Sequence, residues 1–169
     1  MPRAVLAYLR IVEAVNRRLG RASMYLVFAM MAILFWSALT RDFFRPSLWT
    51  LEMAQFVMAA YYLLGGPYSL QLGDHVRMDL LYGPLTARRK AMIDAVTVLF
   101  LVFYLAFLLY GGLSSAGYAL EYGERSYSAW RPYMAPIKIV MCIGIFLMVL
   151  QAIAQLIRDL AAVRGESLP

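Results

Sequence analysis

Four long apolar stretches, separated by short polar connections, form the dominant pattern of the chain. A helix that crosses the hydrocarbon core of a bilayer needs about 20 mostly apolar residues. The pattern therefore predicts membrane-spanning helices at about residues 22–39, 49–72, 92–120 and 136–157. The third is long enough that it must tilt, bend at Gly111-Gly112 or extend past the membrane. We expect an all-α integral membrane protein with a single membrane domain over residues 1–169.

A basic and amphipathic segment, residues 3–20, precedes the first apolar stretch. At about 100° per residue its apolar side chains share one face of a helix. They are Val5, Leu9, Val12, Val15 and Leu19. The arginines gather on the other side, as in a helix that lies in the membrane interface. A basic extension that only fixes the topology is the alternative.

Composition agrees with a membrane protein, because 63% of the residues are hydrophobic and 15% are charged, against roughly 25% charged in soluble domains. The net charge of +6 comes from basic residues between apolar segments. This pattern favours lipid headgroups over nucleic acid as counter-ions. Cys142 and His75 are the single cysteine and histidine, so an intrachain disulfide is excluded and no ligand set for zinc, haem or an iron–sulfur cluster is expected.

The distribution of lysine and arginine predicts the orientation. Eleven of them lie in the two terminal segments and the loop after the second span, against five in the other two loops. Cytoplasmic loops carry the excess of basic residues, so both termini are expected in the cytoplasm. The first apolar stretch is too long for a signal peptide and no A-x-A cleavage site follows it, which favours a retained span.

Ionisable groups are scarce in the predicted spans. Glu52 and Asp94 each lie one turn inside a span, where both can reach water or headgroups. Gln151 and Gln155, one turn apart, are more typical of contacts that hold helices together than of a solute site. No nucleophile and base share a motif, so an enzyme is not expected. A chain with four spans and neither a charged pathway nor a catalytic group is expected to serve a larger complex.

Several stretches resemble a known family. They are "LLGGPYSLQLGDHVRMDLLY" at the end of the second span, "ERSYSAWRPYMAPIK" before the fourth, and "LQAIAQLIRDL" at its end. Together with Glu52 after a tryptophan, they resemble the small membrane subunit of TRAP (tripartite ATP-independent periplasmic) transporters, the DctQ-like family. The H-V-R-x-D core is the most specific piece.

The resemblance implies a scaffold in the bacterial inner membrane. It would support a large elevator-type membrane subunit, which imports organic acids such as carboxylates or keto acids by sodium symport, and a periplasmic binding protein. Two rival classes stay open: a self-contained oligomeric channel or carrier, and the membrane anchor of a respiratory enzyme. The single histidine argues against a haem-bearing anchor.

Two sets of residues are candidates for contacts with these partners. His75, Arg77, Asp79 and Glu52 are expected to anchor the inner loop and the large subunit, with a pH switch at His75 as the alternative. The loop from Glu121 to Lys138 mixes charges and aromatic side chains, as protein interfaces do. Its docking candidates for the binding protein are Glu124, Arg125, Trp130 and Arg131. An aromatic belt at the membrane boundary is the alternative for this loop.

Overall fold

The computed structural model describes residues 3–43, 45–73 and 86–163, which form helices joined by short connections. The helices are α1 (Arg3–Met24), α2 (Leu26–Phe43), α3 (Thr50–Leu72), α5 (Ala87–Glu121) and α6 (Ala135–Val163). Within these ranges the β contact is an isolated bridge between Arg125 and Tyr133. The predicted all-α class is therefore confirmed.

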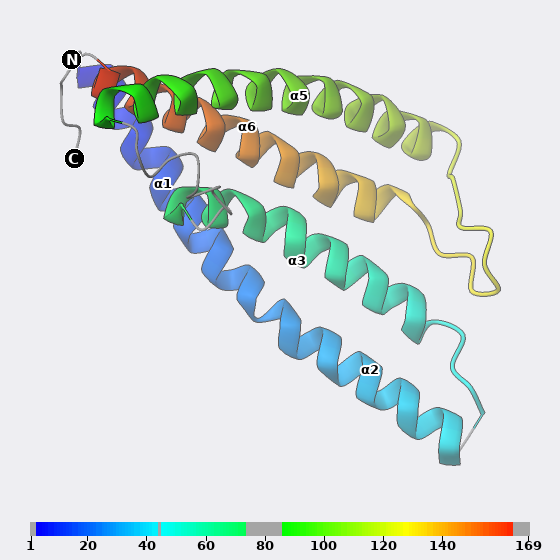
Figure 1. Cartoon of the computed structure of the whole chain (residues 1–169). Coiled ribbons are helices and arrows are strands. Elements are labelled where there is room, and N and C mark those ends of the chain that lie inside the picture. The colour runs from blue at the N-terminus through cyan, green and yellow to red at the C-terminus, as the bar shows by residue number, and fades with distance from the viewer. Residues whose placement is uncertain (1–2, 44, 74–85, 164–169) are drawn as a thin grey trace.

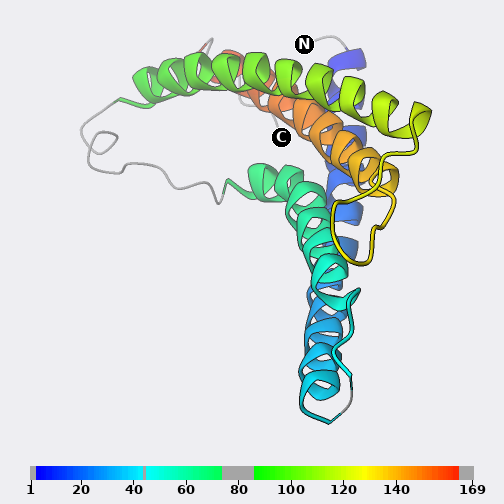
Figure 2. The same cartoon turned by 90° about the vertical axis from the view of Figure 1, so that its right-hand side faces the viewer.

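The helices spread like a fan (Figure 1). α1 and α2 follow one another almost in one line, separated by Tyr25, and α3 runs back beside α2. α5 and α6 form a second antiparallel pair. The α2–α3 and α5–α6 connections lie apart at the open end of the fan in both views (Figures 1 and 2). α6 contacts α5, α3 and α1, so it is the helix that joins the two pairs.

The amphipathic segment forms a helix, and part of its predicted apolar face packs on protein, whereas Val15 and Leu19 are exposed. Leu9 and Val12 of α1 are buried against Ala154 of α6. Asn16, farther along α1, is also buried. α1 is thus held through this face by α6, and by α3 beside it. A position in the membrane interface stays a prediction.

Three helical segments of the described chain are long and apolar enough to cross a membrane: Arg3–Phe43, Met92–Glu121 and Ala135–Val163. α3 is also a long helix, but polar residues and the sequence Gly65-Gly66-Pro67 lower its hydropathy. The first segment includes both α1 and α2. The structure thus supports a multi-pass helical membrane protein, while the predicted count of four spans remains a proposal.

α5 covers the third apolar stretch, and its 35 residues remain helical through Gly111-Gly112. A continuous helix of this length measures about 52 Å. A side chain at Gly112 would meet Cys142 of α6, whereas nothing lies within 4 Å of a side chain built at Gly111. Gly112 therefore serves close packing of α5 on α6, and Gly111 does not.

α3 takes part in two close helix crossings, one with α6 and one with α1. A Cβ atom added to Gly144 would lie 2.7 Å from the carbonyl oxygen of Leu63. On the other side of α3, a Cβ added to Gly20 of α1 would lie 2.3 Å from the Cβ of Tyr68. Small residues at such crossings let membrane helices approach closely. α3 is therefore packed tightly between α1 and α6.

Candidate functional site

A buried pair of amides connects α1 to α6. The Nδ2 atom of Asn16 donates a hydrogen bond of 2.7 Å to the Oε1 atom of Gln151. Asn16 is 1% exposed and Gln151 is 0% exposed. Among the described residues, Asn16 Oδ1 and Gln151 Nε2 have no further hydrogen-bond partner. The pair is thus held inside the protein, away from lipid and from bulk water.

Two further polar contacts connect α1 to α6. Glu13 of α1 forms an ion pair with Arg158 of α6. The hydroxyl of Tyr8 donates a hydrogen bond of 2.9 Å to the carbonyl oxygen of Leu150. We call these three contacts between α1 and α6 the polar seam.

Gln155, the second predicted helix-holding glutamine, has a different contact. Its Nε2 atom donates a hydrogen bond of 3.0 Å to Asp159 Oδ1, which lies one turn later on α6 itself. Asn16, the actual partner of Gln151, was not identified from the sequence. Its side of α1 could have been noticed, because a lone asparagine follows Leu9 and Val12 on the face that turned out to be buried.

Glu52 lies in the first turn of α3 and is half-buried. Its Oε2 atom is inaccessible and has no hydrogen-bond partner among the described residues. Close by in sequence, the buried hydroxyl of Thr50 bonds to Ser37 at 3.0 Å and to Ser47 at 2.9 Å. These hydroxyls hold the end of α2 to the start of α3. His75, Arg77 and Asp79, the other predicted anchors, lie outside the described residues.

The loop between α5 and α6 is shaped by its own charged side chains. Glu124 forms an ion pair with Lys138, and both side chains are partly buried. Arg125 hydrogen-bonds to the hydroxyl of Tyr133, and its guanidinium carbon lies 4.2 Å from the centre of that ring. The backbone N–H of Met134 also donates a hydrogen bond of 3.0 Å to the carbonyl oxygen of Glu124. Glu124 and Arg125 therefore have partners within the chain.

The other two predicted docking residues, Trp130 and Arg131, lie at the surface of the same loop. Trp130 is 38% exposed. Arg131 has a positive φ of 50°, and its N–H donates a hydrogen bond of 3.2 Å to Ser128 Oγ. Tyr127 is fully exposed. The exposed side chains of the loop thus include aromatic rings and two cations, Arg125 and Arg131.

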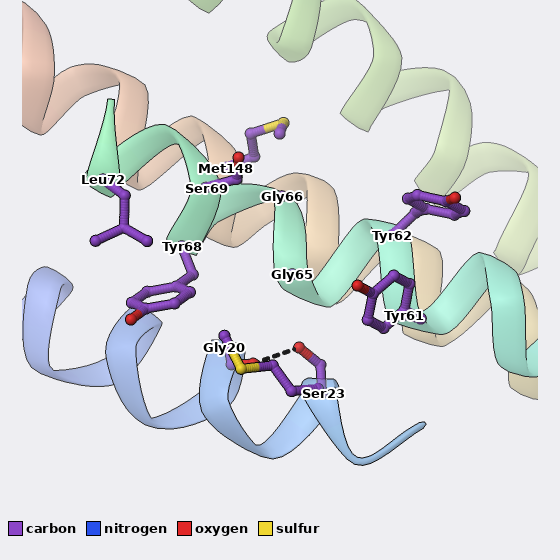
Figure 3. A pocket seen from close by; sticks show the side chains of 11 residues that line it. Gly20, Ser23, Tyr61, Tyr62, Gly65, Gly66, Tyr68, Ser69, Leu72 and Met148 are labelled. Carbon is purple, nitrogen blue, oxygen red and sulfur yellow. Dashed lines mark hydrogen bonds between the residues drawn. The ribbon is translucent and has the colours of Figure 1, made fainter. Parts of the chain in front are cut away.

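Two larger hollows open between the helices. One, of about 430 Å³, lies beside the α1–α2 junction and α3, with tyrosine and serine hydroxyls in its wall (Figure 3). Ser23 there donates a hydrogen bond of 2.8 Å to the carbonyl oxygen of Gly20. The other, of about 520 Å³, lies between α3 and the start of α6. Within the described ranges, no three His, Cys, Asp or Glu side chains gather where they could hold a metal.

A family model described as tripartite ATP-independent periplasmic transporters, DctQ component, matches residues 6–162. The match includes every helix of the fold and both loops in which partner contacts were predicted. Neither the curated proteins nor the solved structures give a match. The resemblance that the sequence motifs indicated is confirmed over nearly the whole chain, which belongs to the DctQ family, the small component of TRAP transporters.

Proposed function

We propose that this chain is the fixed membrane scaffold of a sodium-coupled TRAP transporter that imports organic acids such as carboxylates or keto acids. The family match over residues 6–162 carries the proposal. The large membrane subunit would move the substrate and the sodium ions, and a periplasmic binding protein would deliver the substrate. The chain would hold the large subunit in the bacterial inner membrane.

The packing supports a scaffold rather than a moving part. The polar seam and the tight crossing at Gly144 connect α1, α3 and α6 at several points along their lengths. We assign Gln151 the role of fastening α1 to α6, and Gln155 the role of orienting Asp159 beside it. Helices fastened in this way give a large subunit a fixed surface to move against.

Uptake measurements test the scaffold proposal. Cells that produce the large subunit and the binding protein, with or without this chain, would be given labelled carboxylates and keto acids under a sodium gradient. High-affinity uptake is expected only with all three proteins present. Solute flux through vesicles that contain this chain alone would instead establish the channel or carrier alternative.

For the topology, we propose four spans with both termini in the cytoplasm, α3 being the second span. The excess of basic residues at the termini and in the loop after α3 supports this orientation. α3 also runs antiparallel to α2 along its length, as a returning span would (Figure 1). Alkaline phosphatase fused after Tyr127 should be active, and fused after Arg89 inactive. The opposite result would reverse the orientation.

We propose that the loop between α5 and α6 docks the binding protein through Trp130 and Arg131, while Glu124 and Arg125 keep the loop in shape. Charges at the edge of an interface chiefly steer the encounter. Arg131→Glu should therefore raise the concentration of binding protein that gives half-maximal uptake. Arg45→Glu, in the other outer loop, is the matched control. If both variants need the same concentration of binding protein for half-maximal uptake, the loop is an aromatic belt at the membrane boundary and not a docking surface.

The inner loop is proposed to anchor the large subunit through His75, Arg77 and Asp79, and Glu52 to contribute from the other end of α3. A charge whose partner is removed at a protein contact is costly. Arg77→Ala or Asp79→Ala should therefore lower the yield of the assembled complex in mild detergent. Normal assembly, combined with a new pH dependence of uptake, would favour the switch role of His75.

A further inference from the structure

The hollow of about 520 Å³ between α3 and α6 is a groove with an apolar wall. Its side chains come from helices far apart in the sequence, Met53, Phe56, Val57 and Ala60 on α3, and Ile137 and Val140 on α6. The groove lies at the open end of the fan, where the α5–α6 loop diverges from α3 (Figure 1). An apolar groove in this place can take a hydrocarbon chain.

Arg131 is the charged residue in the groove lining. No carboxylate of the described chain lies within ion-pair distance of its guanidinium. Arg131 also lines an adjoining hollow of about 340 Å³, together with Arg125, tyrosines of the loop and Glu124, whose carboxylate is paired with Lys138. A backbone φ of 50° is unfavourable for a side chain with a Cβ atom, yet the hydrogen bond to Ser128 Oγ holds it. The loop thus places an unpaired cation between the two hollows.

We propose that this groove binds one phospholipid, with an acyl chain along the α3–α6 wall and the phosphate at Arg131. Phosphate accepts strong hydrogen bonds from a guanidinium, and the lipid supplies both the anion and the apolar chain that the groove lacks. A helix from a partner protein would fill the apolar part but leave the charge of Arg131 without a counter-ion. Trp130 and Tyr133 at the mouth are residue types common at headgroup level.

The site goes beyond the scaffold function. With the proposed topology, the groove would lie in the outer leaflet of the membrane. A lipid held there would fill the space between the two helix pairs. The lipid would act as a structural part of the scaffold, because it would contact both α3 and the start of α6, which line the groove.

Quenching of Trp130 tests the site in the full chain. The chain has three tryptophans, so Trp36→Phe and Trp49→Phe leave Trp130 as the reporter. The purified chain in dodecylmaltoside would be titrated with phosphatidylglycerol brominated in its acyl chains, in the absence of the binding protein. A brominated alkyl maltoside, which has no phosphate, is the comparison quencher. We expect saturable quenching by the phospholipid at a lower concentration than by the maltoside.

Two variants separate the parts of the site. Arg131→Gln should raise the phospholipid concentration for half-maximal quenching about tenfold, because a charge-assisted bond to phosphate is lost. Arg45→Gln, the control in the other outer loop, should not. Ala60→Phe should lower the maximal quenching by filling the groove; if this variant does not fold, Arg131→Gln decides alone.

The proposal is overturned if Arg131→Gln and Arg45→Gln give the same titration, or if the maltoside quenches as readily as the phospholipid. It is also overturned if a large subunit, purified with this chain and free of tryptophan, abolishes quenching, since a protein then covers the groove. In the complete transporter, the lipid phosphate and the binding protein would share Arg131, the phosphate holding it while the binding protein is absent. Because no binding protein is present in the titration, failure here leaves the docking and scaffold proposals standing.

Discussion

The hydrogen bond between Asn16 and Gln151 should be measurable as a coupling energy. Asn16→Leu leaves the Gln151 side chain, which is 0% exposed, with no partner among the described residues. An unpaired buried polar group costs about 1–3 kcal/mol, and double-mutant cycles in a membrane protein average about 0.6 kcal/mol with a maximum of about 1.7. We therefore expect each single variant, Asn16→Leu or Gln151→Leu, to lose about 1–2 kcal/mol of unfolding free energy.

The double variant should lose less than the sum of the two. Asn16 Oδ1 and Gln151 Nε2 already have no hydrogen-bond partner in the described chain, and replacing both amides removes these groups together. The coupling energy should then lie between about 0.6 and 1.7 kcal/mol. Gln55→Leu, at an exposed position of α3, combined with Gln151→Leu is the matched control and should show no coupling.

Reversible unfolding of the purified chain by dodecyl sulfate in mixed micelles, followed by circular dichroism, would give these free energies. Two-state behaviour must be checked with a second probe, such as tryptophan fluorescence. If the effects of Asn16→Leu and Gln151→Leu add within about 0.3 kcal/mol, the bond does not stabilise the fold and the fastening role assigned to Gln151 is wrong.

Two other contacts give sharp predictions. Gly144→Val should lower the unfolding free energy by more than about 1–3 kcal/mol, because it pushes α6 away from the Leu63 backbone. Gly117→Val, the control with nothing within 4 Å of the added Cβ, should fold normally. Equal thermal stability of the two variants would refute the close crossing. Lys138→Met should speed amide exchange in the α5–α6 loop by roughly three- to tenfold by leaving Glu124 without its cation, and unchanged exchange would show that this ion pair does not hold the loop.

The long apolar helices could be predicted from the sequence because length and hydrophobicity are properties of a continuous segment. The segment 49–72 of the apolar pattern has nearly the bounds of the helix α3, Thr50–Leu72, which begins after Trp49 and ends at Gly73 with a left-handed φ of 74°. The predicted segment 136–157 lies inside α6, Ala135–Val163. α6 continues past residue 157 through Asp159, a helical residue that the hydropathy pattern places outside the membrane.

The contacts of the polar seam could not be predicted in the same way. Asn16 and Gln151 are 135 residues apart, and nothing in the local pattern of either segment names the other. The apolar face predicted for residues 3–20 is only partly right, because Leu9 and Val12 are buried whereas Val15 and Leu19 are exposed. Periodicity cannot distinguish a face that meets lipid from one that meets α6. The sequence of the α5–α6 loop shows its mixture of charges and aromatic residues. The pairing of Glu124 with Lys138 could not be predicted, because it depends on the direction in which the first turn of α6 points Lys138.

Packing around α6 explains how the helices of such an apolar chain can associate in one specific arrangement. In a bilayer, lipid competes for apolar side chains, so helix association depends on close packing and interhelical hydrogen bonds. The buried face of α6 supplies both, with Gly144, Ala152 and Ala154 allowing close approach and Gln151 fixing one partner. Large side chains on the outer faces of α2 and α5, such as Phe35 and Phe103, are instead exposed. This separation leaves the outer faces of α2 and α5 available to lipid or to a larger subunit without disturbing the contacts that hold the helices together.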